Sequence, residues 1–221
     1  MKFKIVSLFV LCAILISCGT SRQGGKKQRK GTKAQVVLTP EQQRKYDYFF
    51  LEASRLKMKD DYSAAFDLLQ HCLTINPNAS SALYEISQYY MYLKQVPQGQ
   101  AALEKAVEND PDNYWYSQGL ASLYQQQNEM QKATNLLENM ATRFSDRMDP
   151  LYSLLDIYNR LEEYDNVITT LNRLEEKMGK NEQLSMEKFR IYLQKKDNQS
   201  AFREIESLVE EYPMDMRYQV I

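Results

Sequence analysis

The chain has 221 residues, of which 43% are hydrophobic and 26% are charged, and its formal net charge is −1. This composition is typical of a folded globular protein, and the near-neutral charge argues against a nucleic-acid-binding protein, which would carry a strongly basic domain. One histidine and three cysteines leave little for a metal site or a disulfide framework. With only seven glycines and six prolines, the chain favours helices over a many-turned β-sandwich.

Residues 1–17 have the pattern of a secretory signal peptide. Lys2 and Lys4 precede an uncharged run from Ile5 to Ile16. As a helix this run would rise about 18 Å, well short of the ~30 Å hydrocarbon core of a bilayer. The run therefore predicts a signal peptide rather than a permanent membrane span.

The run ends in Leu15-Ile16-Ser17-Cys18-Gly19, which resembles the lipobox of bacterial lipoproteins. The resemblance implies cleavage before Cys18, acylation of its thiol and acylation of the new amino group. An ordinary signal peptide with a chance cysteine is the alternative interpretation. Several acyl chains on one residue exceed the two signals that stable anchoring needs, so we expect a lipid anchor at Cys18.

Residues 18–40 are predicted to be the lipidated cysteine and a flexible basic tether. Residues 19–40 hold six lysines or arginines and no acidic residue, and Gly24, Gly25 and Gly31 add flexibility, with no helical or strand periodicity. Such a tether would span roughly 25 Å. Its charge suits two roles that the sequence does not separate, a patch resting on anionic lipid headgroups and a solvated spacer.

Residues 41–221 repeat with a period of 34 residues. Pro77 and Pro111 are one period apart, and Pro213 lies three periods further on. With repeats that start at residues 46, 80, 114, 148 and 182, similar residues fall into columns without insertion or deletion. Column eleven holds Leu56, Tyr90, Tyr124, Tyr158 and Tyr192, column twenty holds Ala65, Gly99, Ala133, Val167 and Ala201, and column twenty-four holds Leu69, Leu103, Leu137, Leu171 and Ile205.

These columns resemble the tetratricopeptide repeat, which has tyrosine at column eleven, small residues at columns eight and twenty, and a large residue at column twenty-four. The resemblance implies an all-α fold, a right-handed α-solenoid of about five helix-turn-helix repeats. A sixth repeat would start at Met216, but the sequence supplies only six of its residues. Because the last repeat of a solenoid otherwise exposes apolar surface, we expect a fragment of a longer array or end-to-end self-association.

The resemblance also implies where a partner binds. In this family, columns two, five, nine and twelve of the first helix of each repeat face a concave groove. Exposed aromatic rings along such a groove are typical anchors for a peptide, and the alternative is that several are half-buried packing residues. The candidate groove residues are Phe50, Tyr84, Trp115, Gln118, Tyr152 and Met186.

The sequence shows no catalytic pattern. His71, the only histidine, precedes Cys72, and adjacent residues of a helix point about 100° apart, so the two side chains do not face each other. No glycine-rich phosphate loop, nucleophile elbow or metal-ligand spacing is present. We therefore expect that the protein is not an enzyme and that it has no catalytic residue, metal or cofactor.

Together these features predict a lipoprotein of the bacterial cell envelope whose groove holds a protein or peptide partner. The residue after Cys18 is Gly19 rather than an aspartate. In many lipoproteins this means export to the outer membrane. We expect the protein to face the periplasm. Two alternatives stay open: an assembly factor for outer-membrane proteins or pili, and a lipoprotein that binds glycan or peptidoglycan.

The lipid anchor can be tested by replacing its cysteine. We expect Cys18→Ala to abolish acylation and to leave the protein either with an uncleaved signal or as a soluble form. Labelling cells with a radioactive fatty acid measures this directly. Equal labelling of the wild type and the variant would show that Cys18 is not the acylated residue.

Overall fold

The computed structural model describes residues 37–214, which form ten α-helices and no strand. The signal peptide, Cys18, most of the basic tether and Met216 lie outside the described residues. The helices are α1 (Pro40–Lys57), α2 (Tyr62–Ile75), α3 (Ser80–Tyr92), α4 (Val96–Asn109), α5 (Tyr114–Gln126), α6 (Met130–Arg143), α7 (Asp149–Arg160), α8 (Tyr164–Met178), α9 (Glu182–Gln194) and α10 (Asn198–Glu211).

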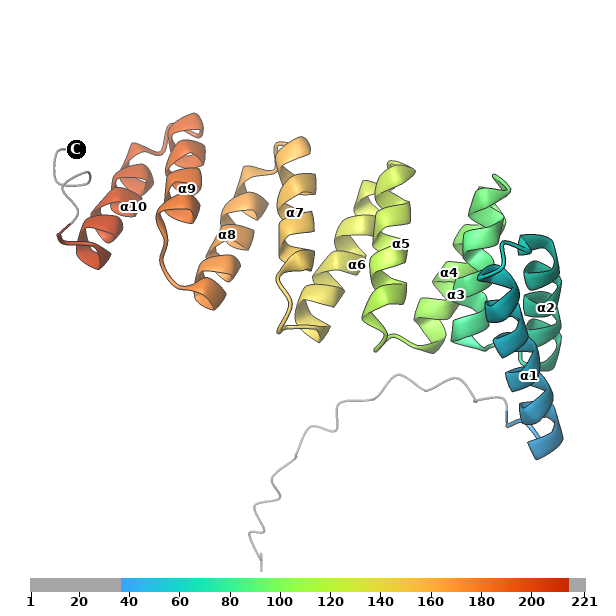
Figure 1. The fold of residues 1–221 in the computed structure, drawn as a ribbon. Coiled ribbons are helices and arrows are strands. Elements are labelled where there is room, and N and C mark those ends of the chain that lie inside the picture. The colour runs from blue at the N-terminus through green and yellow to red at the C-terminus, as the bar shows by residue number, and fades with distance from the viewer. Residues whose placement is uncertain (1–36, 215–221) are drawn as a thin grey trace, which may run out of the picture. The chain divides into compact units, whose positions relative to one another are not determined.

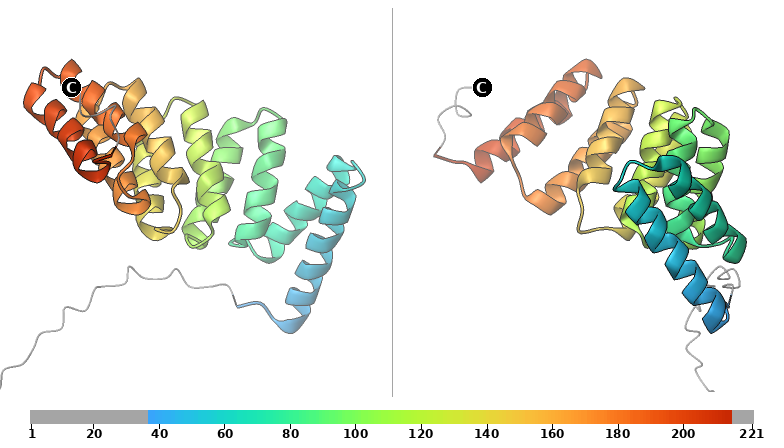
Figure 2. Two further views of the ribbon diagram at one scale, coloured as in Figure 1. Left: turned by 60° about the vertical axis from the view of Figure 1, so that its left-hand side comes forward. Right: turned by 45° about the vertical axis from the view of Figure 1, so that its right-hand side comes forward.

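The ten helices form five consecutive pairs, α1–α2 to α9–α10, and each helix packs against the helices next to it in the sequence. All views show the helices succeeding one another in chain order, with α1 and α10 at opposite ends of this part of the chain (Figures 1 and 2). This arrangement confirms the predicted all-α solenoid.

The first helix begins earlier than the repeat phase alone suggests. It starts at Pro40, because Thr39 and Gln42 form a capping box at its N-terminus. The Thr39 hydroxyl accepts a hydrogen bond from the Gln42 backbone N–H at 3.2 Å, and the Gln42 side chain accepts one from the Thr39 N–H at 2.9 Å. Two of the unpaired donors that every helix start presents are thereby satisfied.

The turn inside each pair has the same backbone conformation. Five non-glycine residues adopt a positive φ of 56–62°, and they are 34 residues apart: Asp60, Lys94, Asn128, Glu162 and Lys196. The residue after each of these five donates its backbone N–H to the column-eleven carbonyl, as from Gln95 to Tyr90 at 2.8 Å and from Glu129 to Tyr124 at 2.8 Å. This is the left-handed helix cap that commonly ends a helix, here built without glycine.

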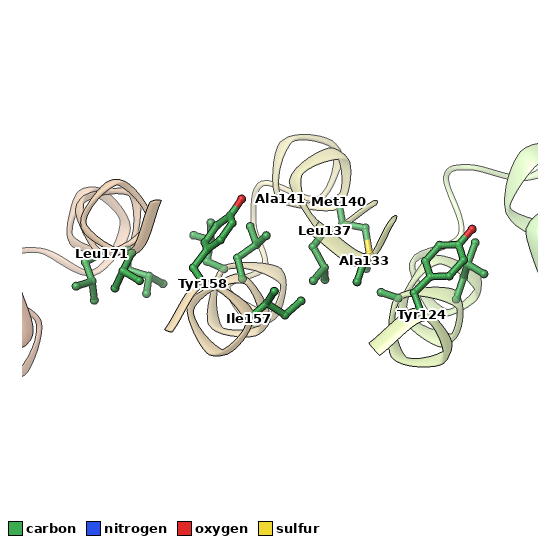
Figure 3. Packing of buried hydrophobic residues seen from close by; sticks show 14 of the residues in the cluster. Tyr124, Ala133, Leu137, Met140, Ala141, Ile157, Tyr158 and Leu171 are labelled. Atoms are coloured by element: carbon green, nitrogen blue, oxygen red, sulfur yellow. The ribbon is translucent and has the colours of Figure 1, made fainter. Parts of the chain in front are cut away.

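The core consists of the predicted columns. Ala133, Leu137 and Met140 of α6 are at most 2% exposed and lie between Tyr124 of α5 and Ile157 of α7 (Figure 3). Small residues at column twenty allow the two helices of a pair to approach closely. At Gly99 an added Cβ would lie 3.1 Å from the Ser87 carbonyl oxygen and 2.7 Å from Met91 Cε, so this pair leaves almost no room for a side chain.

Charged groups lie beside the core where α8, α9 and α10 meet, while Leu174 of α8 and Leu184 and Ile191 of α9 continue the main core across this junction. The Lys188 side chain is only 2% exposed, and its ammonium lies 2.8 Å from Glu175 and 2.9 Å from Glu204. Lys180 reaches the same two carboxylates at 3.2 and 3.1 Å. Asn172 Oδ1 accepts a further hydrogen bond from Lys188 at 3.2 Å. We call Glu175, Lys180, Lys188 and Glu204 the buried ion cluster.

Two members of the buried ion cluster, Glu175 and Lys188, replace apolar residues of the repeat pattern. The column of Lys188 holds Ile86, Leu120 and Leu154 in the three preceding repeats. The column of Glu175 holds Val107 and Ala141 earlier in the chain. Beyond the cluster, Ile205 and Leu208 form a small core of their own, separate from the main one. The last pair is therefore joined to the array partly by charge.

We predict that acid weakens this junction before the rest of the fold. Burial alone would raise the pKa of Glu175, but Lys188 and Lys180 outweigh burial and lower that pKa below its ordinary value of 4.5. The stabilisation is therefore present above about pH 5 and is lost as the pH falls through the folded pKa. Hydrogen exchange of the α9 and α10 amides, measured from pH 7 to pH 3.5, should speed up more than exchange of the α5 and α6 amides.

Two variants provide the controls. Glu175→Gln should destabilise the chain by about 1–3 kcal/mol and flatten the pH dependence, because Lys188 loses a charged partner. The triple variant Glu175→Val, Lys188→Leu and Glu204→Leu restores the apolar pattern and should be neutral or more stable by about 1–4 kcal/mol. Uniform acid sensitivity along α1–α10 would contradict the prediction.

Candidate functional site

The six candidate groove residues differ in how far they are exposed. Trp115 and Tyr152 are 63% and 48% exposed, on the first turns of α5 and α7. The other four, Phe50, Tyr84, Gln118 and Met186, are half-buried. Two aromatic rings of the predicted set are thus accessible to a partner in the described part of the chain.

Trp115 lies in a fixed setting. The side chain of the N-cap residue Asn113 accepts a hydrogen bond from the Trp115 backbone N–H at 3.1 Å, which holds the start of α5. The indole meets the Tyr114 ring edge to face, with centroids 5.3 Å apart. Arg147 places its guanidinium 4.0 Å from the Tyr114 ring centroid and 5.5 Å from that of Trp115. The exposed indole therefore stands beside a positive charge.

Tyr152 stands on the next first helix, α7. Its hydroxyl lies 3.4 Å from the sulfur of Met178 at the end of α8, and Met178 is itself 48% exposed. A tyrosine ring and a thioether together make an adaptable apolar surface. We call Trp115, Arg147, Tyr152 and Met178 the aromatic surface.

The half-buried candidates take part in packing. Phe50 stacks on Tyr46 with ring centroids 6.0 Å apart, and Tyr84 packs against Tyr116 at 4.8 Å. Met186 contacts the small core of Ile205 and Leu208. Gln118 accepts a hydrogen bond from the Tyr114 hydroxyl at 3.0 Å. Each of these four side chains thus has an internal contact that binding would share or replace.

Sequence reasoning did not find Arg147. It lies in the loop between α6 and α7 and also approaches Asp149 at 3.8 Å. No spacing rule places a loop guanidinium over rings of the preceding helix pair, because the contact depends on the path of the loop. The sequence feature that points to Arg147 is its position at the end of the repeat whose first helix begins with Tyr114 and Trp115.

Cys72 lacks the features of a nucleophile. Its side chain is completely buried, and its thiol donates to the Tyr46 carbonyl oxygen at 3.8 Å. Burial raises the pKa of the Cys72 thiol to about 11, which keeps it protonated at neutral pH. Across residues 37–214 no cluster of histidine, cysteine and acidic side chains could hold a metal ion. Nor is any helix in that range long and apolar enough to cross a membrane.

Comparison with known proteins identifies the class of fold. A family model described as "Tetratricopeptide repeat" matches residues 80–113, which comprise α3, α4 and the turn that follows. The fold of the described chain is thus a solenoid of the tetratricopeptide repeat type. None of the curated proteins compared with the chain matches it.

Solved structures resemble this chain over most of its length. A structure titled "Crystal structure of MamA protein" has a TM-score of 0.55 and 18% identity, covering 80% of this chain and 96% of that one. A tetratricopeptide repeat protein from Parabacteroides merdae has a TM-score of 0.56 and 16% identity, covering 79% and 70%. YrrB, titled "a TPR protein with an unusual peptide-binding site", has a TM-score of 0.53 and 13% identity, covering 78% and 88%. At these identities the likeness establishes the fold alone, and no catalytic family is indicated.

The exposure of the aromatic surface predicts that it contributes little to stability. Trp115→Ala and Tyr152→Ala should each change the free energy of unfolding by no more than about 0.5 kcal/mol. Leu103→Ala, at a side chain 2% exposed, should cost about 2–5 kcal/mol because it leaves a cavity. Thermal and urea unfolding measure both effects. Groove variants that unfold as early as Leu103→Ala would show that the two rings are packing residues.

Proposed function

We propose that this protein is a membrane-anchored scaffold that binds a peptide segment of another protein across the aromatic surface. The observation that carries the proposal is the exposure of Trp115, 63%, beside Arg147 on a helix whose core contacts are already complete. Leu120, Ala121 and Tyr124 fill the core side of α5, so the indole is not needed there. Exposed tryptophan beside arginine is the composition of binding hot spots.

The chemistry of the surface suits an extended peptide. The indole of Trp115 and the Tyr152–Met178 contact offer apolar area for side chains, and they stand on consecutive repeats. The Arg147 guanidinium can donate to a carbonyl or carboxylate oxygen of the ligand. Trp115, Tyr152 and Met178 stand on helices that would hold them in place, so binding would require little ordering of the scaffold. The printed title of YrrB names a peptide-binding site, which supports the same class of ligand here.

The membrane part of the proposal rests on the sequence. A lipid on Cys18 would hold the protein at the outer membrane, facing the periplasm, with residues 19–40 as the basic tether. The lipid would keep the scaffold at the surface while the repeats bind the partner. Because anchoring and partner binding depend on different parts of the chain, the anchor and the aromatic surface are tested by separate experiments.

The binding function is tested by capture from solubilised membranes. Wild-type protein, Trp115→Ala and Tyr152→Ala would be compared, with co-purified proteins identified by mass spectrometry. At true anchors we expect each variant to lose about 1–3 kcal/mol of binding free energy, or roughly 5- to 150-fold in affinity for the captured partner. Arg147→Ala should weaken binding and also make it less sensitive to salt.

Tyr48→Ala is the matched control. Tyr48 is 65% exposed on α1, outside the aromatic surface, so its loss should leave capture unchanged. Equal capture by all variants would refute the role of the aromatic surface. Displacement of the partner by peptidoglycan fragments, but not by peptides, would favour a glycan ligand instead.

A further inference from the structure

The first two helix pairs form an open surface pocket that the repeat pattern did not predict. It has a volume of about 280 Å³ and is lined by Lys57, Tyr62, Gln88, Tyr89 and Tyr92. These residues come from the end of α1, the start of α2 and the end of α3. Most of the lining is carbon, supplied by the tyrosine rings. We call this space the tyrosine pocket.

Tyr89 has an unsatisfied hydroxyl in the wall of the tyrosine pocket. The side chain is 8% exposed, and the hydroxyl has no hydrogen-bond partner. The centroid of its ring lies 5.9 Å from that of Phe66 and 6.4 Å from that of Tyr62. Buried polar groups are nearly always paired in folded proteins, so an unpaired hydroxyl at a pocket wall calls for an explanation.

The other repeats show that packing does not require this tyrosine. The column of Tyr89 holds Leu123, Ile157 and Ile191 in the three later pairs, all at most 7% exposed. An aliphatic residue therefore fills the same place in the core without a buried hydroxyl. The second pair departs from the pattern by placing there a ring that contacts Phe66 and Tyr62 and carries a hydroxyl without a hydrogen-bond partner.

Tyr92 and Tyr62 form the outer walls of the pocket. Tyr92 departs from the repeat pattern, and Tyr62 is held in place by a hydrogen bond. Tyr92 is 81% exposed, and its column holds the polar residues Gln126, Arg160 and Gln194 in later pairs. Tyr62 donates a hydrogen bond to Asp60 Oδ1 at 2.7 Å, which fixes its ring. In the fourth pair the counterpart of Tyr62 is Tyr164, and Gln194 donates to its hydroxyl at 2.5 Å across that junction. In the tyrosine pocket the positions of Tyr164 and Gln194 are occupied by the rings of Tyr62 and Tyr92.

The rim and the lining of the pocket indicate which ligand fits. The Lys57 ammonium lies 2.7 Å from Glu85, so the pair adds little net charge at the rim and favours neither a cationic nor an anionic ligand. The Gln88 amide already donates to the Ser87 hydroxyl at 3.2 Å. Sugars need several polar partners, whereas the pocket lining is mainly ring surface, which suits an aromatic side chain.

We propose that the tyrosine pocket binds an aromatic side chain of a peptide, with a main-chain carbonyl oxygen of that peptide accepting a hydrogen bond from Tyr89. The aromatic ring lies between Tyr62 and Tyr92. Because the Tyr89 hydroxyl is covered in the free chain, the exposed Tyr92 side chain shifts to admit the ligand. The proposal rests on the proposed function in one respect, that the ligand is a segment of protein. It places a second anchor in the first two repeats, whereas Trp115 lies in the third.

The test uses N-acetyl-tryptophanamide, which carries one aromatic ring and two carbonyl groups. The full chain, solubilised in detergent and ¹³C-labelled in its tyrosine rings, is titrated by NMR, with Tyr62→Val, Tyr89→Phe and Tyr92→Gln assigning the signals. We expect saturable shifts at the three pocket tyrosines. Tyr92→Gln should weaken binding at least 10-fold, and Tyr89→Phe, which removes only the hydroxyl, should weaken it about 2- to 10-fold.

Stability separates a ligand site from a packing role. Tyr89→Leu installs the residue of the later repeats, so it should melt at the wild-type temperature or above while losing binding. Tyr164→Val is the matched control for Tyr62→Val and should leave binding unchanged. Trp115→Ala should also bind the probe normally, so this result does not depend on the aromatic surface.

Three outcomes would overturn the inference. The first is the absence of saturable shifts at millimolar probe. The second is equal binding by the wild type and Tyr92→Gln, which would place the probe elsewhere. The third is saturation of the same tyrosine signals by N-acetylglucosamine but not by N-acetyl-tryptophanamide, which would make the pocket a glycan site. Partner capture through Trp115 could still succeed in each case, so the two proposals fail separately.

Discussion

Burial of apolar surface between helices adjacent in the sequence is the interaction on which this structure depends. Every substantial helix contact in residues 37–214 joins neighbours in the chain, from α1 with α2 to α9 with α10. Small side chains at Ala133 and Ala201 let paired helices approach, and Leu137 and Leu171 fill the space that remains. Because no helix of this range makes a substantial contact with a distant one, each junction has to be stable by itself.

The sequence predicted the parts of the fold that recur. A column that is Leu69, Leu103, Leu137 and Leu171 in successive repeats is buried in all of them, because the same two helices meet at the same distance each time. The capping box at Thr39 extends α1 beyond the repeat, and it could have been read from Thr39 and Gln42. The helical fold was therefore accessible from periodicity and from local capping rules.

The candidate site was only partly accessible. Column position gives the direction of a side chain but not what lies beside it. Tyr84 and Trp115 are both predicted groove residues. The ring of Tyr84 packs against Tyr116, whereas Trp115 is exposed next to Arg147. These contacts depend on loop paths and on residues outside the repeating columns. For the same reason the buried ion cluster, two members of which occupy apolar columns, was not expected.

The buried ion cluster has a mechanical consequence. In an array coupled only between neighbours, a pulling force along the chain is carried in series, and the weakest junction yields first. Across the junction of α8 with α9, Lys188 pairs with Glu175, whereas Glu204 and the small core of Ile205 and Leu208 lie within the last pair. An ion pair weakens when water enters between its charges. Under load we therefore expect the last helix pair to detach first, while the first four pairs stay folded and retain both the aromatic surface and the tyrosine pocket.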